Sequence, residues 1–438
     1  MRHPSFTAVL ALSAAAAAAA EAPTAMVPVV VIKGARIVTV SGLTIEKGTV
    51  VLSGGKIAAV GAELAVPSGA KVIDGSGKTV YPGLIDGLTT LGLVEIGSVP
   101  GSVDTSEVGD VNPHAMAWVA VQAHSELIPV ARANGVTAAL AAPQGGLISG
   151  QSALLRLAGT TPEALTVKTP VAMHINYPTG RAPFDFTRMF DEPELKTLEE
   201  RLRDKKKNQE KDLKRLANLL EEAKAYGATL EAAKAGRAAV PQPDLPMEAL
   251  APVARGEVPV IMRVDDETDI RGAVRFAGEH TLKLVIAGGL DAWRCADLLK
   301  ENNVPVLINV DRLPRKESDP YDAAYANAGI LFKAGVRFAI VSDDASQSRN
   351  LPYEAAMAAS YGLPAEVALR SITLSPAEIF GVADRMGSLE VGKDANLVVT
   401  TGDILDHRTQ VTDVFIDGAA QSLETRHTRL YKQFKDRQ

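Results

Sequence analysis

The chain has 438 residues, of which 46% are hydrophobic and 22% charged, as in ordinary soluble globular proteins with a sizeable core. This length fits two or three units, although one α/β barrel can occupy about 250 residues by itself. The formal net charge of -6 leaves no dominant basic surface, which argues against nucleic acid as a partner.

The N-terminus has the pattern of a secretory signal peptide over residues 1–20. A short positive start at Arg2 and His3 precedes a run of small and apolar residues at 8–20, and the alanines before Glu21 resemble a cleavage site. The alternative is a disordered alanine-rich tail. We therefore expect a secreted or periplasmic protein, with no membrane contact beyond the signal peptide, since no later stretch holds roughly 18 apolar residues in a row.

β patterning occupies both ends of the rest of the chain. The expected strands are residues 29–32, 35–40, 49–52, 56–60, 71–74 and 79–80 near the start, and 394–400 and 411–418 near the end. Because the two β-rich segments flank one α/β block, we expect them to combine into one composite β-sandwich of residues 27–81 and 386–425. The last ten or so residues are polar and basic and are expected to be a tail.

The middle of the chain alternates buried strands with helices. Candidate strands are residues 135–140, 258–262, 282–286, 304–309 and 336–341, and candidate helices are residues 269–279, 291–302 and 323–334. Such alternation predicts an α/β fold with a parallel sheet, either open or closed into a barrel. Residues 194–226 differ: they are dense in charge with spaced leucines, which predicts a long amphipathic surface helix, broken at most once, in an insertion at about 190–240.

Three segments together resemble the amidohydrolase superfamily, in particular its imidazolonepropionase-like branch. They are VIDGSGKTVYPGLID at 72–86, FAIVSD at 338–343, and the stretch at 372–399 that begins ITLSPAEIFGVADRMGSLEVGKDAN. The similarity extends over residues 30–420 or so. It implies a (β/α)8 TIM barrel at 82–385 beside the composite β-sandwich.

The resemblance also implies hydrolysis of carbon–nitrogen bonds, other than ordinary peptide bonds, with one or two divalent metals such as zinc. The metals would lower the pKa of a bound water and polarise the carbonyl. Histidines of a His-x-His pair on the first strand and of the fifth and sixth strands would bind them, together with an aspartate on the eighth.

This sequence departs from that ligand pattern. Leu88 and Thr90 stand at the two positions of the His-x-His pair, Arg263 stands at the fifth-strand position, and glycine ends the sixth strand. A permanent cation at residue 263 would repel a metal. Only Asp343 remains, so we expect no metal ligands and assign Asp343 as the candidate catalytic residue.

Three further residues are candidates for substrate binding: Arg263, Asp344 and His174. Arg263 has two interpretations, an anion clamp in the barrel mouth or an ion pair with Asp343 that replaces the charge of a lost metal. The two interpretations are compatible, because a ligand can displace a salt bridge. His174 could face the barrel mouth, whereas His114 and His124 have no recognised ligand spacing, and His280 is the other histidine of this part of the chain.

Three hypotheses follow from these residues. The chain is a hydrolase of carbon–nitrogen bonds whose metal-dependent activity is in doubt, or a non-catalytic barrel that binds a small molecule or a partner subunit, or an assembly protein that docks through the charged helix at 194–226. The first two imply a small-molecule substrate or ligand, and an oligomer is compatible with each.

Overall fold

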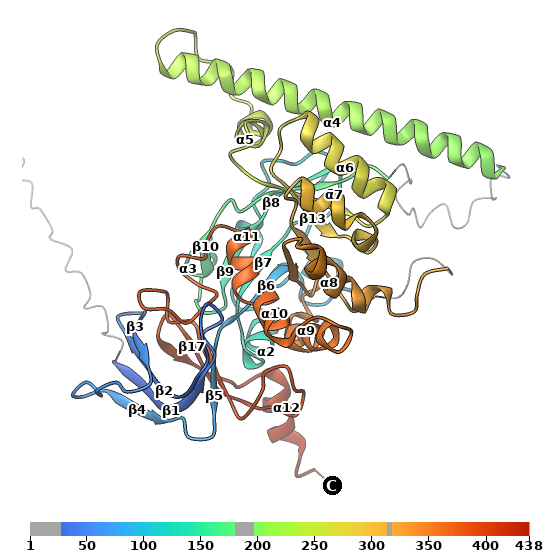
Figure 1. The fold of residues 1–438 in the computed structure, drawn as a ribbon. Helices are drawn as coiled ribbons and strands as arrows, with labels where there is room; N and C mark the ends of the chain where they lie inside the picture. The colour runs from blue at the N-terminus through green and yellow to red at the C-terminus, as the bar shows by residue number, and fades with distance from the viewer. Residues whose placement is uncertain (1–27, 180–196, 313–317, 438) are drawn as a thin grey trace, which may run out of the picture.

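The computed structural model describes residues 28–179, 197–312 and 318–437, which form a barrel of strands and helices beside a β-rich domain (Figure 1). The predicted signal peptide at residues 1–20 lies outside this range. No helix in the described part of the chain is long and apolar enough to span a bilayer.

The β-rich domain is built from both ends of the chain. Its strands are β1 (Val30–Ile37), β2 (Ile45–Ser53), β3 (Lys56–Gly61), β4 (Lys71–Asp74), β5 (Thr79–Pro82), β16 (Leu397–Thr400), β17 (Val411–Ile416) and β18 (Ala419–Gln421). They form one sheet in the order β18-β17-β16-β5-β1-β2-β3, with β4 paired to β1. Strands that are distant in sequence therefore lie side by side at the join of β5 and β16.

The barrel contains the remaining strands. These are β6 (Leu84–Thr89), β7 (Val136–Ala141), β8 (Ile148–Gln151), β9 (Ala153–Arg156), β11 (Met173–Asn176), β12 (Val260–Val264), β13 (Leu284–Gly288), β14 (Val306–Ile308) and β15 (Phe338–Ile340), and β10 (Thr166–Lys168) extends β9 on the outside. The parallel pairs are β6 with β7, and each successive pair from β11 to β15. A backbone hydrogen bond of 2.9 Å from Asp343 N to Leu88 O joins the two ends of the ring.

The third position in the ring is unusual. The segment 148–156 carries both β8 and β9, and it runs antiparallel to β7 on one side and to β11 on the other. The barrel type expected from the sequence is confirmed, with this one reversed position.

Helices surround the barrel and cover its ends. They are α1 (Ala117–Ala120), α2 (Leu127–Ala133), α3 (Pro162–Leu165), α4 (Leu198–Lys234), α5 (Leu245–Ala254), α6 (Glu267–Glu279), α7 (Ala296–Glu301), α8 (Ala323–Ala334), α9 (Leu351–Ser360), α10 (Ala365–Ser371), α11 (Leu374–Ile379) and α12 (Arg426–Phe434), with short 3-10 turns at Pro100–Ser102, Ala292–Cys295 and Ser348–Asn350. The expected tail at the C-terminus is wrong, because α12 is a helix capped by the Thr425 side chain.

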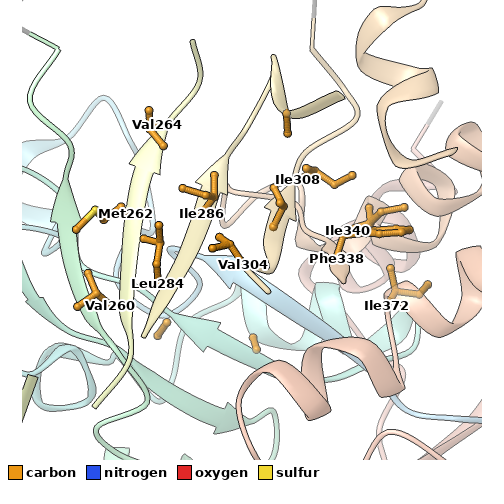
Figure 2. Close-up of a cluster of buried hydrophobic side chains, with 14 of the residues drawn as sticks. Val260, Met262, Val264, Leu284, Ile286, Val304, Ile308, Phe338, Ile340 and Ile372 are labelled. Atoms are coloured by element: carbon orange, nitrogen blue, oxygen red, sulfur yellow. The ribbon is translucent and has the colours of Figure 1, made fainter. Parts of the chain in front are cut away.

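The alternation of side chains along β12 to β15 separates the outside of the barrel from its interior. Figure 2 shows Val260, Met262 and Val264 of β12 in one cluster with residues of the neighbouring strands, such as Ile286 and Ile308, and this cluster packs against the helices. Since successive residues of a strand point to opposite faces, the intervening residues point into the barrel. These inward residues include Arg263 on β12.

The charged segment forms the single helix α4, which lies outside the barrel beside α5 and α6 (Figure 1). Thr197 and Glu200 form a capping box at its start, which satisfies backbone N–H groups that a helix N-terminus leaves free. Leu216, Leu220 and Ala223 are fully buried on its inner face. The helix is unbroken over Leu198–Lys234, and the predicted start at residue 194 lies outside the described part.

Candidate ligand site at the barrel mouth

A small cavity of about 140 Å³ opens at the C-terminal ends of the barrel strands. The residues that line it include Leu88, Arg263, Asp265, Gly288, Arg312 and Asp343. We call it the central cavity. Barrels of this type place their binding and catalytic groups at this end, because the loops that follow the strands converge there.

A larger cavity of about 450 Å³ opens at the opposite end, beside residues such as Lys283, Asn303 and Arg337, which precede β13, β14 and β15. Residues before the strands serve stability in such folds, so its size does not make it the functional site.

Asp343 is held by two arginines in the central cavity. The Arg263 guanidinium donates to both carboxylate oxygens of Asp343, at 2.8 Å to Oδ2 and 2.6 Å to Oδ1. Arg312 donates a third hydrogen bond to Oδ2 at 3.2 Å. Burial alone would lower the pKa of Arg263, but the hydrogen bond and charge of Asp343 outweigh it and raise that pKa. The Arg263 guanidinium therefore stays charged, and the two arginines of the cavity lie beside two carboxylates, those of Asp343 and Asp265.

The backbone around Asp343 is fixed by a buried carboxylate beneath it. Asp343 has a left-handed conformation, with φ of 58°, which aspartate tolerates better than most residues. Just before it, Ser342 donates to Asp86 through its backbone N–H at 3.1 Å and its hydroxyl at 2.5 Å. The Ser348 hydroxyl also donates to Asp86, at 2.8 Å. Burial raises the pKa of Asp86 to about 6, because these hydrogen bonds compensate only part of the desolvation.

The two positions of the expected His-x-His pair serve packing and backbone contacts. Leu88 is 1% exposed and belongs to the apolar cluster that fills the barrel, together with Leu307 and Val341. The Thr90 hydroxyl accepts a hydrogen bond of 3.2 Å from the backbone N–H of Ala345. Neither side chain offers the cavity an imidazole.

The glycine that ends β13 leaves space for a neighbouring carboxylate. Gly288 has a φ of 93°, and a Cβ there would lie 2.4 Å from Oδ1 of Asp265. A histidine at this position would meet both a strained backbone and the Asp265 side chain.

His174 lies inside the barrel on β11, opposite Ile261 and Gly150 in the neighbouring strands. It is 7% exposed, and its Nε2 has no hydrogen-bond partner among the described residues. Burial and the nearby charge of Arg263 lower the pKa of His174 to about 3, so the imidazole is neutral at pH 7. It is not among the residues that line the central cavity.

The other candidates from the sequence are not brought to the cavity. Asp344 is exposed, and its Oδ1 accepts hydrogen bonds from the backbone and hydroxyl of Ser346, at 2.8 and 2.5 Å, so it caps a turn rather than facing a ligand. His114 and His124 are exposed, and His280 stacks on Phe276 with ring centroids 4.4 Å apart.

The residues at the cavity do not fit the divalent metals implied by the resemblance. Arg263 and Arg312 occupy both oxygens of Asp343, and the remaining ligand positions hold Leu88, Thr90 and a glycine. Within the described ranges, no group of three or more His, Cys, Asp or Glu side chains could hold a metal ion.

Sequence reasoning missed three polar residues of the cavity. Arg312 and Asp265 were not singled out, although each follows a strand by a few residues. Asn309 was also missed: its amide nitrogen donates to Ser342 O at 2.7 Å, while its buried Oδ1 has no partner in the described part. Their positions just after the strand ends were the one available indication.

The comparisons with known proteins agree with this barrel. Residues 254–420 match the amidohydrolase family. An amidohydrolase from Thermotoga maritima MSB8 has a solved structure that covers 90% of this chain and 99% of its own, with 26% identity and a TM-score of 0.76. These similarities support the assignment to the amidohydrolase superfamily that the sequence motifs indicate. Which branch it belongs to stays a prediction.

A curated relative, the amidohydrolase tasK of Hapsidospora irregularis, is 24% identical over 385 residues. The aligned region covers 81% of this chain but only 38% of that protein, so the chain spans well under half the length of this relative. A molinate hydrolase of known structure, at 16% identity and a TM-score of 0.56, covers 91% of this chain and 95% of its own, and shares the fold.

Proposed function

We propose that this amidohydrolase-family protein binds a small anionic molecule in the central cavity and does not carry out the metal-dependent hydrolysis that the family resemblance implies. The observation that supports this most is the ion cluster of Arg263, Asp343 and Arg312, which stands where the family's metals would bind. A ligand carboxylate can replace Asp343 at one arginine, because a planar guanidinium binds carboxylates in pairs of hydrogen bonds.

The unpaired acceptor of Asn309 defines the ligand further. Asn309 lines the cavity beside the arginines, and its buried Oδ1 has no partner in the described part, so a ligand N–H that reaches it would supply one. A compound with a carboxylate next to an amide N–H, such as an N-acyl amino acid, would satisfy both.

The test is to titrate the protein with N-acetylglycine and, separately, with its methyl ester, which lacks the charge, and to measure both affinities by calorimetry. We expect the acid to bind and the ester to bind at least about tenfold more weakly, since hydrogen bonds to charged groups are worth more than neutral ones. Arg263→Gln should abolish this preference. Arg349→Gln, an exposed arginine that does not line the cavity, is the matched control.

Hydrolysis of carbon–nitrogen bonds is the second candidate, and one observation favours it. Asp343 stands at the end of the eighth strand, where the family resemblance puts an aspartate that moves the proton. Elemental analysis with a screen of dipeptides and lactams separates the two candidates. We expect well under one equivalent of zinc, manganese or iron and no turnover; two equivalents, or activity that Asp343→Asn removes, would overturn the first proposal.

A further inference from the structure

A second cavity, of about 340 Å³, lies outside the central one, between α8 and α9. It is lined by Asp311 after β14, Tyr325 of α8, and Tyr353, Glu354 and Met357 of α9. We call it the α8–α9 cavity. Neighbouring residues of the chain line the two cavities, since Asp311 lines this one and Arg312 lines the central cavity.

The most unusual group in this cavity is the Glu354 carboxyl. The residue is 6% exposed, and its Oε2 has no hydrogen-bond partner within the described residues. A buried carboxyl oxygen without a partner is costly, and natural proteins keep few of them. Because Glu354 lines a cavity, a ligand whose N–H group reaches this oxygen would supply the partner it lacks.

The surroundings of Glu354 favour a positive ligand. Burial is the first cause that raises the pKa of Glu354 to about 9, followed by the negative charges of Asp86 and Asp311. Opposing them are the positive charge of Arg312, which is committed to Asp343, and a backbone hydrogen bond from Val310. The carboxylates of Asp86 and Asp311 therefore make the electrostatic potential at Glu354 favourable for a positive group.

The remaining lining suits an organic cation rather than a metal ion. Tyr325 and Tyr353 offer aromatic surface, and Met357 offers a flexible apolar side chain. Aromatic rings beside carboxylates attract guanidinium and ammonium groups through charge and through the ring faces.

We propose that the α8–α9 cavity is a binding site for a small organic cation that carries N–H donors, such as an alkylguanidinium, with Glu354 and Asp311 as its charge partners. The site is separate from the central cavity and independent of the function proposed above.

Benzylguanidine is the probe, and benzylurea is its neutral counterpart of nearly the same shape. By calorimetry at pH 7, we expect benzylguanidine to bind wild-type protein at least about tenfold more tightly than benzylurea. Binding should also release protons, because Glu354 ionises when the cation arrives; titrations in two buffers of different ionisation enthalpy measure this release. A lack of preference for the cation would overturn the proposal.

Variants locate the binding. Glu354→Gln keeps the size of the side chain and should weaken benzylguanidine binding at least about tenfold and remove the proton release. The control Glu366→Gln, on an exposed position of the neighbouring α10, should change neither. Unchanged binding in Glu354→Gln would contradict the site.

Two further variants keep the test decisive if Glu354→Gln does not fold. Met357 is 41% exposed, so Met357→Lys should fold, and its ammonium should compete with the ligand and abolish binding. Asp343→Asn should alter benzylguanidine affinity by less than about twofold. A loss of binding in Asp343→Asn would place the cation in the central cavity and refute a separate site.

Discussion

The Asp343 carboxylate neutralises one of two guanidinium groups that meet in the barrel mouth. Its side chain is 13% exposed, against 35% for Arg263 and 43% for Arg312. Removing a partly buried partner leaves the remaining charges without compensation, which costs more than the pair contributes.

Asp343→Asn should therefore lower the free energy of unfolding by about 1–3 kcal/mol, toward the lower value because water reaches the arginines. Urea denaturation at pH 7 measures this. Asp413→Asn is the control: Asp413 pairs with Lys78 at 3.6 Å nearer the surface, and a change below about 0.5 kcal/mol is expected. Equal changes in the unfolding free energy of the two variants would show that Asp343 stabilises the protein no more than a surface ion pair does.

His174 gives the protein a pH dependence of predictable sign. Its pKa is about 3 when folded, against 6.5 for the free side chain, so the unfolded chain binds a proton that the folded chain rejects between these values. The stability associated with His174 is therefore present above pH 6.5 and is lost as the pH falls toward 3. His174→Leu lacks this loss. The unfolding free energy of the variant minus that of wild type should therefore increase as the pH is lowered from 7 to 4.5. A constant difference would show that His174 is protonated normally.

At the scale of the strand, Gly288 ends β13 in a conformation that other residues avoid. Gly288→Ala should lower the unfolding free energy by more than about 1 kcal/mol, because φ is 93° and the new Cβ would lie 2.4 Å from Oδ1 of Asp265. In Gly278→Ala, within α6, the new Cβ meets nothing within 4 Å, and that variant should be neutral or stabilised. Thermal unfolding measures the melting temperatures of both variants, and similar values would refute the steric argument.

The helix α4 offers a second test at this scale. Leu216 is fully buried on the face toward the barrel, whereas Leu202 is 56% exposed. Leu216→Ala should cost about 2–4 kcal/mol through the cavity it leaves, and Leu202→Ala less than about 0.5 kcal/mol. Equal stability of the two variants would show that α4 does not pack as described.

The sequence predicted elements better than it predicted contacts. Periodicity located the strands at 258–262 and 282–286 and the helices at 269–279 and 323–334, because buried and exposed faces alternate along them. It did not identify the strands β8 and β9 within 148–156, and their antiparallel direction leaves no mark in the pattern of buried residues. It also missed the helix α12, whose side chains are all at least partly exposed.

At the candidate site, family motifs identified Arg263 and Asp343, and charge complementarity suggested their pairing before the structure showed it. Arg312, Asp265 and Asn309 were missed because their approach depends on three-dimensional closure of the barrel. Asp344 was misplaced for the same kind of reason: adjacent residues in a turn point in different directions, and its carboxylate caps the turn.

For the molecule as a whole, two successive C-terminal segments, the strands β16 to β18 and the helix α12, contribute unequally to stability. A protein truncated after Glu424 loses α12, which has no buried residue and contacts the barrel through the exposed pair of Arg429 and Glu126. Its melting temperature should fall by no more than a few degrees. Truncation after Asn396 removes β16 to β18 and the buried Phe415, and should give insoluble protein. Expression and thermal unfolding of both truncations measure this, and a soluble, cooperative second fragment would contradict it.

The pairing of β5 with β16 also determines when the chain can fold. The Thr400 hydroxyl donates to the backbone carbonyl of Thr79, 321 positions earlier. A ribosome therefore releases the first half of this sheet long before it makes the partner strands, and loop closure over such a distance is slow. Until the last tenth of the polypeptide emerges, the open edge of β5 offers unpaired N–H and C=O groups to any neighbouring chain, so the nascent protein has its greatest need of a chaperone at that edge.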